Sequence, residues 1–236
     1  LIGKNQWLDL KELKLDYLFH TRPYNSYLPR EYMSVEVCKY TKICFLLYAM
    51  SLTEGELSII LKRDFMRHVY CYFAETKVSQ KAFRKQYRLA HKLGLVKSPD
   101  YGMPALEEIV SCKDATSELW KFSHNDFRVM WTPRWSTNPE LGGSNFFVYK
   151  DWFLKYASEN PDVDLLIRPH PLTFPNFIRT GEMTEDEVDT YKKVIADANN
   201  ICLDEEKEYV STIWNSSVLV SDYSGMIPEY FVTGKP

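Results

Sequence analysis

Two short apolar runs in this 236-residue chain lead directly into polar clusters, and this pattern limits the fold more than any other feature. The runs are Leu165–Ile167 and Val218–Val220, and the clusters that follow them are Arg168–Pro171 and Ser221–Tyr230. Apolar runs this short, bounded by polar residues, are typical of strands buried in a parallel sheet. Open α/β sheets bind ligands at the carboxyl ends of such strands, so both clusters are predicted to lie at one binding edge.

Strand and helix patterns alternate along the second half of the chain. Thr184 and Glu187 have the spacing of a capping box at the start of an amphipathic segment. The alternation predicts an α/β fold, with βαβ units and a parallel sheet covered by helices on both faces. Strands are expected at residues 127–131, 164–168, 201–203 and 218–221, and helices at 145–157, from 184 onward, at 209–215 and through Pro228 to about 232.

The first half predicts a second α/β unit. We expect two domains, residues 1–115 and 116–236, with the boundary within 111–126. Gly234–Pro236 would normally lead into another buried strand, so both domains are expected to be incomplete parts of a larger protein. The expected strands are 16–19 and 43–47, the expected helix between them is 30–40, and helical spacing dominates 54–73 and 79–93.

Charge and cysteine content limit the partners. The formal net charge of −3 predicts no general attraction to nucleic acid. The five cysteines are widely spaced and form no CxxC or Cys/His pattern, so neither a disulfide framework nor a metal site is favoured. The run Ile43–Met50 is too short to cross a bilayer, and no signal peptide is visible. These features predict a cytoplasmic protein that is at most bound at a membrane surface.

One stretch of the first half is strongly basic. Between Thr76 and Pro99 lie seven Lys or Arg and no acid. Apolar residues stand among these charges, so the stretch is suited to a polyanionic acceptor or to anionic lipid headgroups. A solvated amphipathic helix explains the same pattern without a ligand.

The two polar clusters offer groups that suit a phosphate. His170 can donate a hydrogen bond or a proton near neutral pH, and Arg168 carries a permanent charge beside it. Ser221 and Ser224 offer hydroxyls, while Gly225 at a helix start lets backbone N–H groups approach a phosphate closely. If the two apolar runs are neighbouring strands, their ends converge and the two clusters can hold one diphosphate.

These residues also have structural explanations. A histidine between two prolines can cap a strand end, and Ser224 can be a simple helix N-cap. Asp222 is expected to orient the loop or His170, because a carboxylate repels phosphate. The segment 171–183 is long for a βα connection, and its side chains suit either closure over a ligand or burial; they include Phe174, Pro175, Phe177 and Arg179.

The clusters resemble motifs of the CDP-glycerol glycerophosphotransferase family, which polymerises glycerol-phosphate chains of teichoic acids and related capsules. The family has a strand ending in Arg-x-His-Pro, here Arg168–Pro171, and later Ser/Thr-Asp-Tyr-Ser-Ser/Gly with a following acid, here Ser221–Gly225 and Glu229. Trp131–Trp135 replaces an upstream Pro-Thr-Phe-Arg-like turn, a departure that leaves Arg134 as a candidate site residue. Looser similarity extends to Pro23–Tyr32, Lys39–Thr41 and Gly102–Leu106.

The resemblance implies a GT-B architecture, in which two Rossmann-like domains face a cleft and the second domain holds the nucleotide donor. It implies a metal-independent transfer of glycerol phosphate from CDP-glycerol to a polyol-phosphate or glycan acceptor, at the inner membrane face and without a cofactor. His170 would then be catalytic, Glu229 would hold ribose hydroxyls, and Asp204 with Tyr209 would meet the cytosine base. For Glu229 the alternative is a solvated helix carboxylate. The family's second catalytic histidine lies in a His-Gly motif that this sequence lacks and that would precede Leu1.

Two other functions fit parts of the sequence. A GT-B glycosyltransferase that uses a nucleotide sugar would need the same phosphate-binding clusters. A non-catalytic module that binds carbohydrate or polyanions would use the basic stretch, and it would bind polyanions in a salt-dependent way without binding nucleotides.

Overall fold

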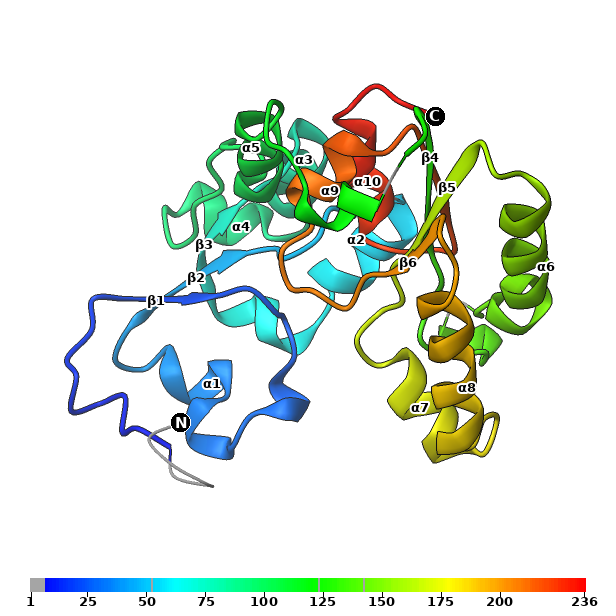
Figure 1. Ribbon diagram of the computed structural model, residues 1–236. Helices are drawn as coiled ribbons and strands as arrows, with labels where there is room; N and C mark the ends of the chain where they lie inside the picture. The colour runs from blue at the N-terminus through cyan, green and yellow to red at the C-terminus, as the bar shows by residue number, and fades with distance from the viewer. Residues whose placement is uncertain (1–6, 52, 123, 142) are drawn as a thin grey trace. The chain divides into compact units, whose positions relative to one another are not determined.

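The computed structural model describes residues 7–51, 53–122, 124–141 and 143–236. The chain divides into two compact units, Leu1–Ala105 and Leu106–Pro236, each built around its own parallel sheet (Figure 1). The boundary predicted at residue 115 therefore falls inside the second unit. The helix α5, Pro104–Ser111, begins at the division.

The first unit contains a three-stranded parallel sheet in the order β1-β2-β3 (Figure 1). Its core gathers buried side chains from β2 and β3, such as Phe45 and Tyr72, against Phe83 of a covering helix. Thr53 and Thr76 begin the two longest helices with reciprocal capping boxes. The strands are β1 Tyr17–His20, β2 Lys42–Leu46 and β3 Val69–Phe73, and the helices are α1 Ser34–Val37, α2 Glu54–Leu61, α3 Lys77–Gln86 and α4 Arg88–Lys92.

Two predictions for the first unit were wrong. The helical pattern read over 54–73 ends at Leu61, and Val69–Phe73 is a strand. This segment is rich in β-branched and aromatic residues, which favour a strand once a neighbouring strand is available. The helix expected at 30–40 is shorter, with a 3-10 turn at Arg30–Tyr32 followed by α1.

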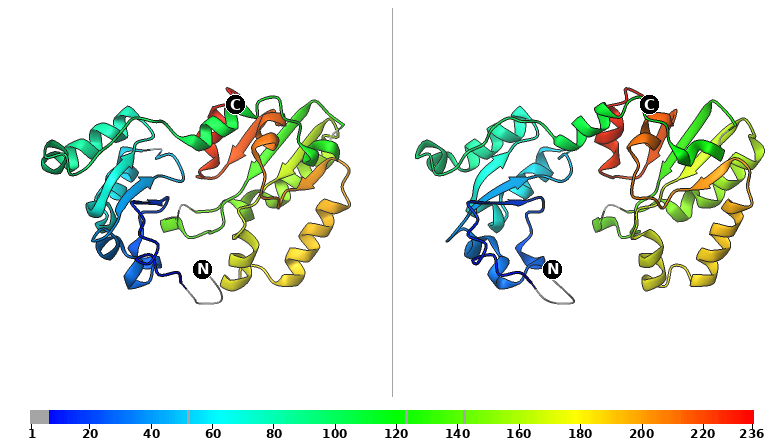
Figure 2. Two further views of the ribbon diagram at one scale, coloured as in Figure 1. Left: turned by 90° about the vertical axis from the view of Figure 1, so that its left-hand side faces the viewer. Right: turned by 60° about the vertical axis from the view of Figure 1, so that its left-hand side comes forward.

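The second unit contains a four-stranded parallel sheet in the order β6-β5-β4-β7. Figure 2 shows this sheet from two directions, with helices on both of its faces. The predicted strands and helices of this half are confirmed to within a few residues. The strands are β4 Phe127–Thr132, β5 Val163–Ile167, β6 Ile201–Leu203 and β7 Val218–Ser221, and the helices are α6 Phe146–Glu159, α7 Thr173–Thr180, α8 Glu185–Ala196, α9 Val210–Asn215 and α10 Met226–Phe231.

The strand order corrects a central expectation. Strands β5 and β7 are not neighbours, because β4 lies between them. Trp131 of β4 pairs with Ile167 on one side and with Val220 on the other. The two sequence clusters therefore flank the end of β4, and the loop that follows β4 separates them.

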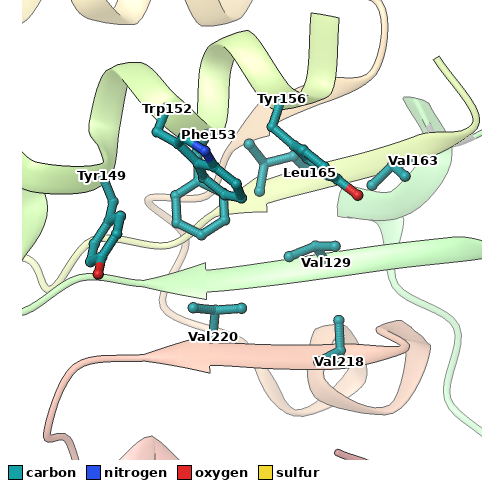
Figure 3. Close-up of a pocket in the computed structure, with 9 residues that line it drawn as sticks. All are labelled: Val129, Tyr149, Trp152, Phe153, Tyr156, Val163, Leu165, Val218 and Val220. Carbon is teal, nitrogen blue, oxygen red and sulfur yellow. The ribbon is translucent and has the colours of Figure 1, made fainter. Parts of the chain in front are cut away.

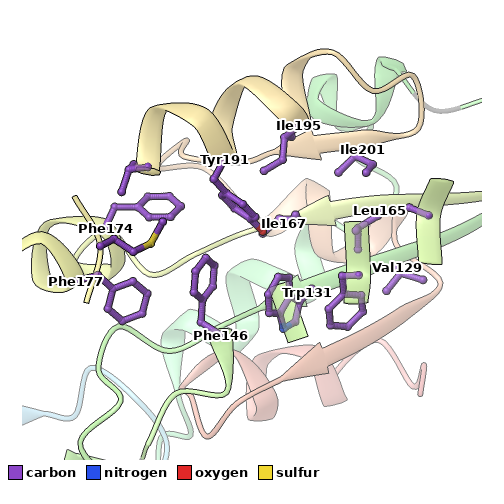
Figure 4. Close-up of a cluster of buried hydrophobic side chains, with 14 of the residues drawn as sticks. Val129, Trp131, Phe146, Leu165, Ile167, Phe174, Phe177, Tyr191, Ile195 and Ile201 are labelled. Carbon is purple, nitrogen blue, oxygen red and sulfur yellow. The ribbon is translucent and has the colours of Figure 1, made fainter. Parts of the chain in front are cut away.

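Helices cover the two faces of this sheet unequally. On one face Trp131 stacks on Phe146 and Phe153 of α6, within a core that α7 and α8 complete (Figure 4). On the other face a smaller cluster joins Met130 and Leu166 to side chains of α9 and α10. The sheet is thus buried from both sides, as the continuous apolar strands predict.

The segment 171–183 is not an open loop. It contains helix α7, which ends at Gly181 in a left-handed conformation with φ of 75°. Phe174 and Phe177 are 5% and 0% exposed and belong to the core, so they do not close over a ligand (Figure 4). The capping box at Thr184 is confirmed: its hydroxyl accepts from the Glu187 N–H, and the Glu187 carboxylate accepts from the Thr184 N–H.

Candidate functional site

The loop after β4 occupies the middle of the candidate site. Neighbouring strands lie about 4.8 Å apart, so the ends of β5 and β7 are separated by roughly 10 Å. Backbone hydrogen bonds tie the three loops together: the His170 N–H donates to the Pro133 carbonyl at 3.4 Å, and the Asp222 N–H donates to the Thr132 carbonyl at 3.4 Å. This edge therefore brings together the residues after β4, β5 and β7.

Arg134 of this loop contacts the cluster after β7. Its backbone N–H donates to Asp222 Oδ2 at 2.9 Å, and its guanidinium donates to the Tyr223 carbonyl. The guanidinium also lies over the Tyr223 ring, 5.8 Å from the centroid. Its Nε is buried and has no hydrogen-bond partner among the described residues. Arg134 thus has an unused donor at the centre of the edge.

Asp222 holds the loops rather than presenting a charge to a ligand. Besides the Arg134 N–H, its carboxylate accepts hydrogen bonds from Asn145 Nδ2 at 2.8 Å, from the Asn145 N–H and from Ser144 Oγ. Asn145 is the residue that precedes α6. Asp222 therefore fixes the end of β7 to the loop after β4 and to the start of α6, and Ser144 and Asn145 are site residues that the sequence reasoning missed.

His170 is exposed, and its hydrogen bonds define which ring nitrogen carries the proton. The Leu172 N–H donates to His170 Nδ1 at 3.1 Å. A backbone N–H can only donate, so Nδ1 accepts and the neutral ring carries its proton on Nε2. Partial desolvation of the ring on its protein-facing side and the positive charge of Arg134 lower the pKa of His170 below its usual value of 6.5. His170 is therefore a neutral imidazole at neutral pH, with Nε2–H as its hydrogen-bond donor.

The serines after β7 form a hydroxyl chain. Thr132 Oγ1 donates to Ser221 Oγ at 2.7 Å, and Ser221 Oγ donates to the Asp222 carbonyl at 2.6 Å. Ser224 Oγ lies 3.4 Å from Ser221 Oγ and accepts from the N–H of Met226, the first residue of the short helix α10, at 3.1 Å, while Gly225 is the N-cap residue of that helix. Gly225 is right-handed, with φ of −63°.

Arg168 and Asp204 form a buried ion pair at the ends of β5 and β6. Their side chains are 14% and 0% exposed. The Arg168 guanidinium also donates to the Glu206 carbonyl at 2.8 Å and lies 5.1 Å from the Tyr209 ring centroid. Burial raises the pKa of Asp204 despite the opposing effect of Arg168. Both side chains are engaged with each other, and the complete burial of Asp204 gives no support to its predicted contact with a base.

Glu229 lies in the same buried cluster. It is 8% exposed, so the alternative of a solvated helix carboxylate is wrong. Burial raises the pKa of Glu229, while a hydrogen bond with Tyr209 and the charge of Arg168 oppose that rise. Burial also raises the pKa of the Tyr209 hydroxyl. Glu229 therefore holds Tyr209 by a hydrogen bond and Arg168 by its charge, in the protein interior.

An apolar pocket of this unit lies apart from these residues. Its volume is about 310 Å³, and its walls are aromatic side chains of α6 and valines of the strands (Figure 3). None of the predicted site residues lines it. Among residues 7–51, 53–122, 124–141 and 143–236 there is also no cluster of three or more metal-ligating side chains, and none of the helices is long and apolar enough to cross a membrane.

Known proteins resemble this chain in their fold and not in their sequence. No protein-family model and no curated protein matches the sequence. S. aureus MnaA in a structure with UDP matches with a TM-score of 0.61 and 13% identity, over 96% of this chain and 58% of that chain. A UDP-GlcNAc 2-epimerase from Methanocaldococcus jannaschii, in complex with UDP-GlcNAc and UDP, matches with a TM-score of 0.57 and 12% identity, over 96% and 60%.

The wall teichoic acid polymerase TagF is also similar, with a TM-score of 0.53 and 12% identity, over 94% of this chain and 53% of that chain. These likenesses confirm the predicted fold class, α/β with parallel sheets and GT-B-like. This chain spans little more than half the length of the proteins that it resembles.

Proposed function

We propose that the carboxyl edge of the second sheet binds the diphosphate of a nucleotide-activated donor, and that the protein transfers glycerol phosphate from CDP-glycerol to a hydroxyl of a polyol-phosphate or glycan acceptor. The observation that carries this proposal is the place of Arg134, with its unpaired Nε, between the loops of His170 and Ser224. The resemblance of both clusters to glycerophosphotransferase motifs and the likeness to TagF support the donor.

The proposed chemistry is displacement at phosphorus. The acceptor oxygen forms a bond to the β-phosphorus of CDP-glycerol, the bond from that phosphorus to the bridging oxygen breaks, and CMP leaves with the bridging oxygen. Negative charge grows on the leaving phosphate, where Arg134 and the Nε2–H of His170 donate hydrogen bonds. A single preorganised donor of this kind contributes on the order of 3 kcal/mol to the transition state. The acceptor proton passes to a base other than His170, whose neutral ring acts as a donor.

The remaining residues position these groups. Asp222 holds the Arg134 backbone, and Ser221 and Ser224 complete the phosphate-facing turn. Arg168 and Asp204 fix the end of β5, from which His170 projects. Direct contacts of Asp204 and Glu229 with the nucleotide are not part of this proposal, because both side chains are buried.

Calorimetric titration with CDP-glycerol tests the proposal. Arg134→Met removes the central guanidinium, and His170→Asn removes the imidazole donor. Arg179→Met is the matched control, since Arg179 is an exposed arginine of α7 that donates to Asn176 in its own helix. We expect binding to weaken at least tenfold in Arg134→Met, as for loss of one charge-assisted hydrogen bond, and to be unchanged in the control. Equal binding by all three variants would contradict the site.

A nucleotide sugar is the second candidate donor, because two of the similar structures contain UDP. Parallel titrations with CDP-glycerol, UDP-GlcNAc and CMP separate the two. A preference for UDP-GlcNAc that depends on Arg134 would keep the site and replace the donor.

A further inference from the structure

A second pocket lies in the first unit, at the carboxyl end of β2. Its volume is about 210 Å³. Tyr24 reaches it from the loop after β1, Tyr48 and Ser51 reach it from the loop after β2, and Arg63 reaches it from the end of α2. This is the edge at which open parallel sheets bind ligands, and none of the unit-two residues discussed above takes part in it.

Within the described part of the chain, Arg63 forms no ion pair with an acidic side chain, although it lines this pocket. Its guanidinium lies over the Tyr24 ring, 4.5 Å from the centroid, and its Nε is buried with no hydrogen-bond partner among the described residues. Neighbouring arginines are engaged: Arg67 pairs with Asp64 at 3.8 Å, and Arg84 donates to the Ser98 carbonyl at 3.0 Å. A guanidinium with a buried, unused N–H is costly unless a ligand accepts from it.

The pocket contains a second unused polar group. Ser51 Oγ is buried and has no hydrogen-bond partner in the described part of the chain. The carboxylate of Glu56 also lines the pocket, and it accepts the Thr53 N–H at 3.3 Å in the capping box that begins α2. Both groups that lack partners, the Arg63 Nε–H and the Ser51 hydroxyl, can donate a hydrogen bond to a ligand.

We propose that this pocket binds an oxyanion, a phosphate or carboxylate group carried by a small molecule. Arg63 provides a planar donor fork for the oxyanion, and Ser51 provides a hydroxyl donor. Tyr24 keeps the guanidinium in place by stacking, and Tyr48 with Ile59 and Ile60 contacts the less polar part of the molecule. The site is independent of the proposed transferase edge, since it uses residues of the first unit only.

Titrations of a protein that carries Arg134→Met test this site apart from the other one. The probes are inorganic phosphate, pyrophosphate and citrate, and the readouts are heat of binding and the NMR signal of the Arg63 side-chain N–H. We expect one site in this protein, weakened about tenfold or more by Arg63→Gln and unaffected by Arg67→Gln. Arg67→Gln removes the same charge from an exposed arginine of the same segment.

The relative affinities of the three probes identify the class of anion. Tighter binding of phosphate or pyrophosphate than of citrate indicates a phosphorylated ligand, and tighter binding of citrate indicates a carboxylate. If Arg63→Gln fails to fold, Ser51→Ala provides the second variant, and its binding is expected to weaken while its fold persists. Binding that is the same in Arg63→Gln and Arg67→Gln, or no binding of any probe, would overturn the proposal.

Discussion

The ion pair between Arg168 and Asp204 makes a quantitative prediction about stability. Three proteins are needed: Asp204→Ala, Arg168→Met and the double variant. Removing one partner of a buried pair costs about 3–5 kcal/mol, because the other charge is left uncompensated. Asp204 is completely buried and Arg168 is 14% exposed, which places both in this range. Arg168 keeps the Glu206 carbonyl and the nearby Glu229 charge, so we expect the low end, about 3 kcal/mol, for Asp204→Ala.

The double variant separates this explanation from simple loss of packing. Burial raises the pKa of Asp204 even beside Arg168, so the pair as a whole has little net advantage over apolar side chains. The double variant is therefore expected to lose about as much as one single variant, about 3 kcal/mol, which corresponds to a coupling energy of about 3 kcal/mol. Strictly additive losses would refute this reasoning.

Urea unfolding followed by tryptophan fluorescence is a suitable assay. Five of the six tryptophans lie after residue 106, since only Trp7 precedes it, so the signal reports mainly on the second unit. With a typical slope of about 1–3 kcal/mol/M, a loss of 3 kcal/mol moves the midpoint by roughly 1 M or more. Circular dichroism of the single variants checks that the sheet persists.

Three further predictions concern other parts of the molecule. Phe177→Ala removes a fully buried ring, so unfolding free energy should fall by about 3–5 kcal/mol in the same assay, whereas a loss below about 1 kcal/mol would place Phe177 outside the core. The pKa of His170 is lowered in the folded protein, so the unfolded chain takes up a proton below pH 6.5 that the folded protein does not yet bind. The free energy of unfolding should therefore decrease as the pH falls below 6.5, and this decrease should be less steep in His170→Asn. Identical slopes of unfolding free energy against pH in the two proteins would contradict this. Leu89 and Leu93 are 71% and 63% exposed within the basic stretch, so Leu93→Asp should weaken co-sedimentation with phosphatidylserine vesicles, an effect that added salt should also produce; unchanged sedimentation would favour the solvated helix.

The sequence predicted the elements of the second unit well because their signals are local. Short apolar runs, the Thr184 capping box and the helical stripe after it each depend on residues within one element. Helix α7 was missed because Phe174 and Phe177 in a segment with a proline also fit a loop, and only packing against α6 and α8 distinguishes the two.

The strand order could not be derived in the same way. Pairing of β4 with both β5 and β7 depends on contacts between residues far apart in the chain, and each apolar run fits either position in a parallel sheet. Arg134 was only a candidate because its turn departs from the motif of the resembled family, and the strand order that places its loop between the other two could not correct this. The burial of Asp204 and Glu229 could not be predicted either, because charged residues near strand ends are usually exposed, whereas here Arg168 and Tyr209 accompany them into the interior.

A crystal structure of the protein soaked with CDP tests the central claim most directly. The account predicts the diphosphate at the carboxyl edge of the second sheet, with an oxygen within about 3 Å of Arg134 Nε and another near His170 Nε2. A nucleotide found in the apolar pocket beside α6, or a diphosphate with no contact to Arg134, would contradict it.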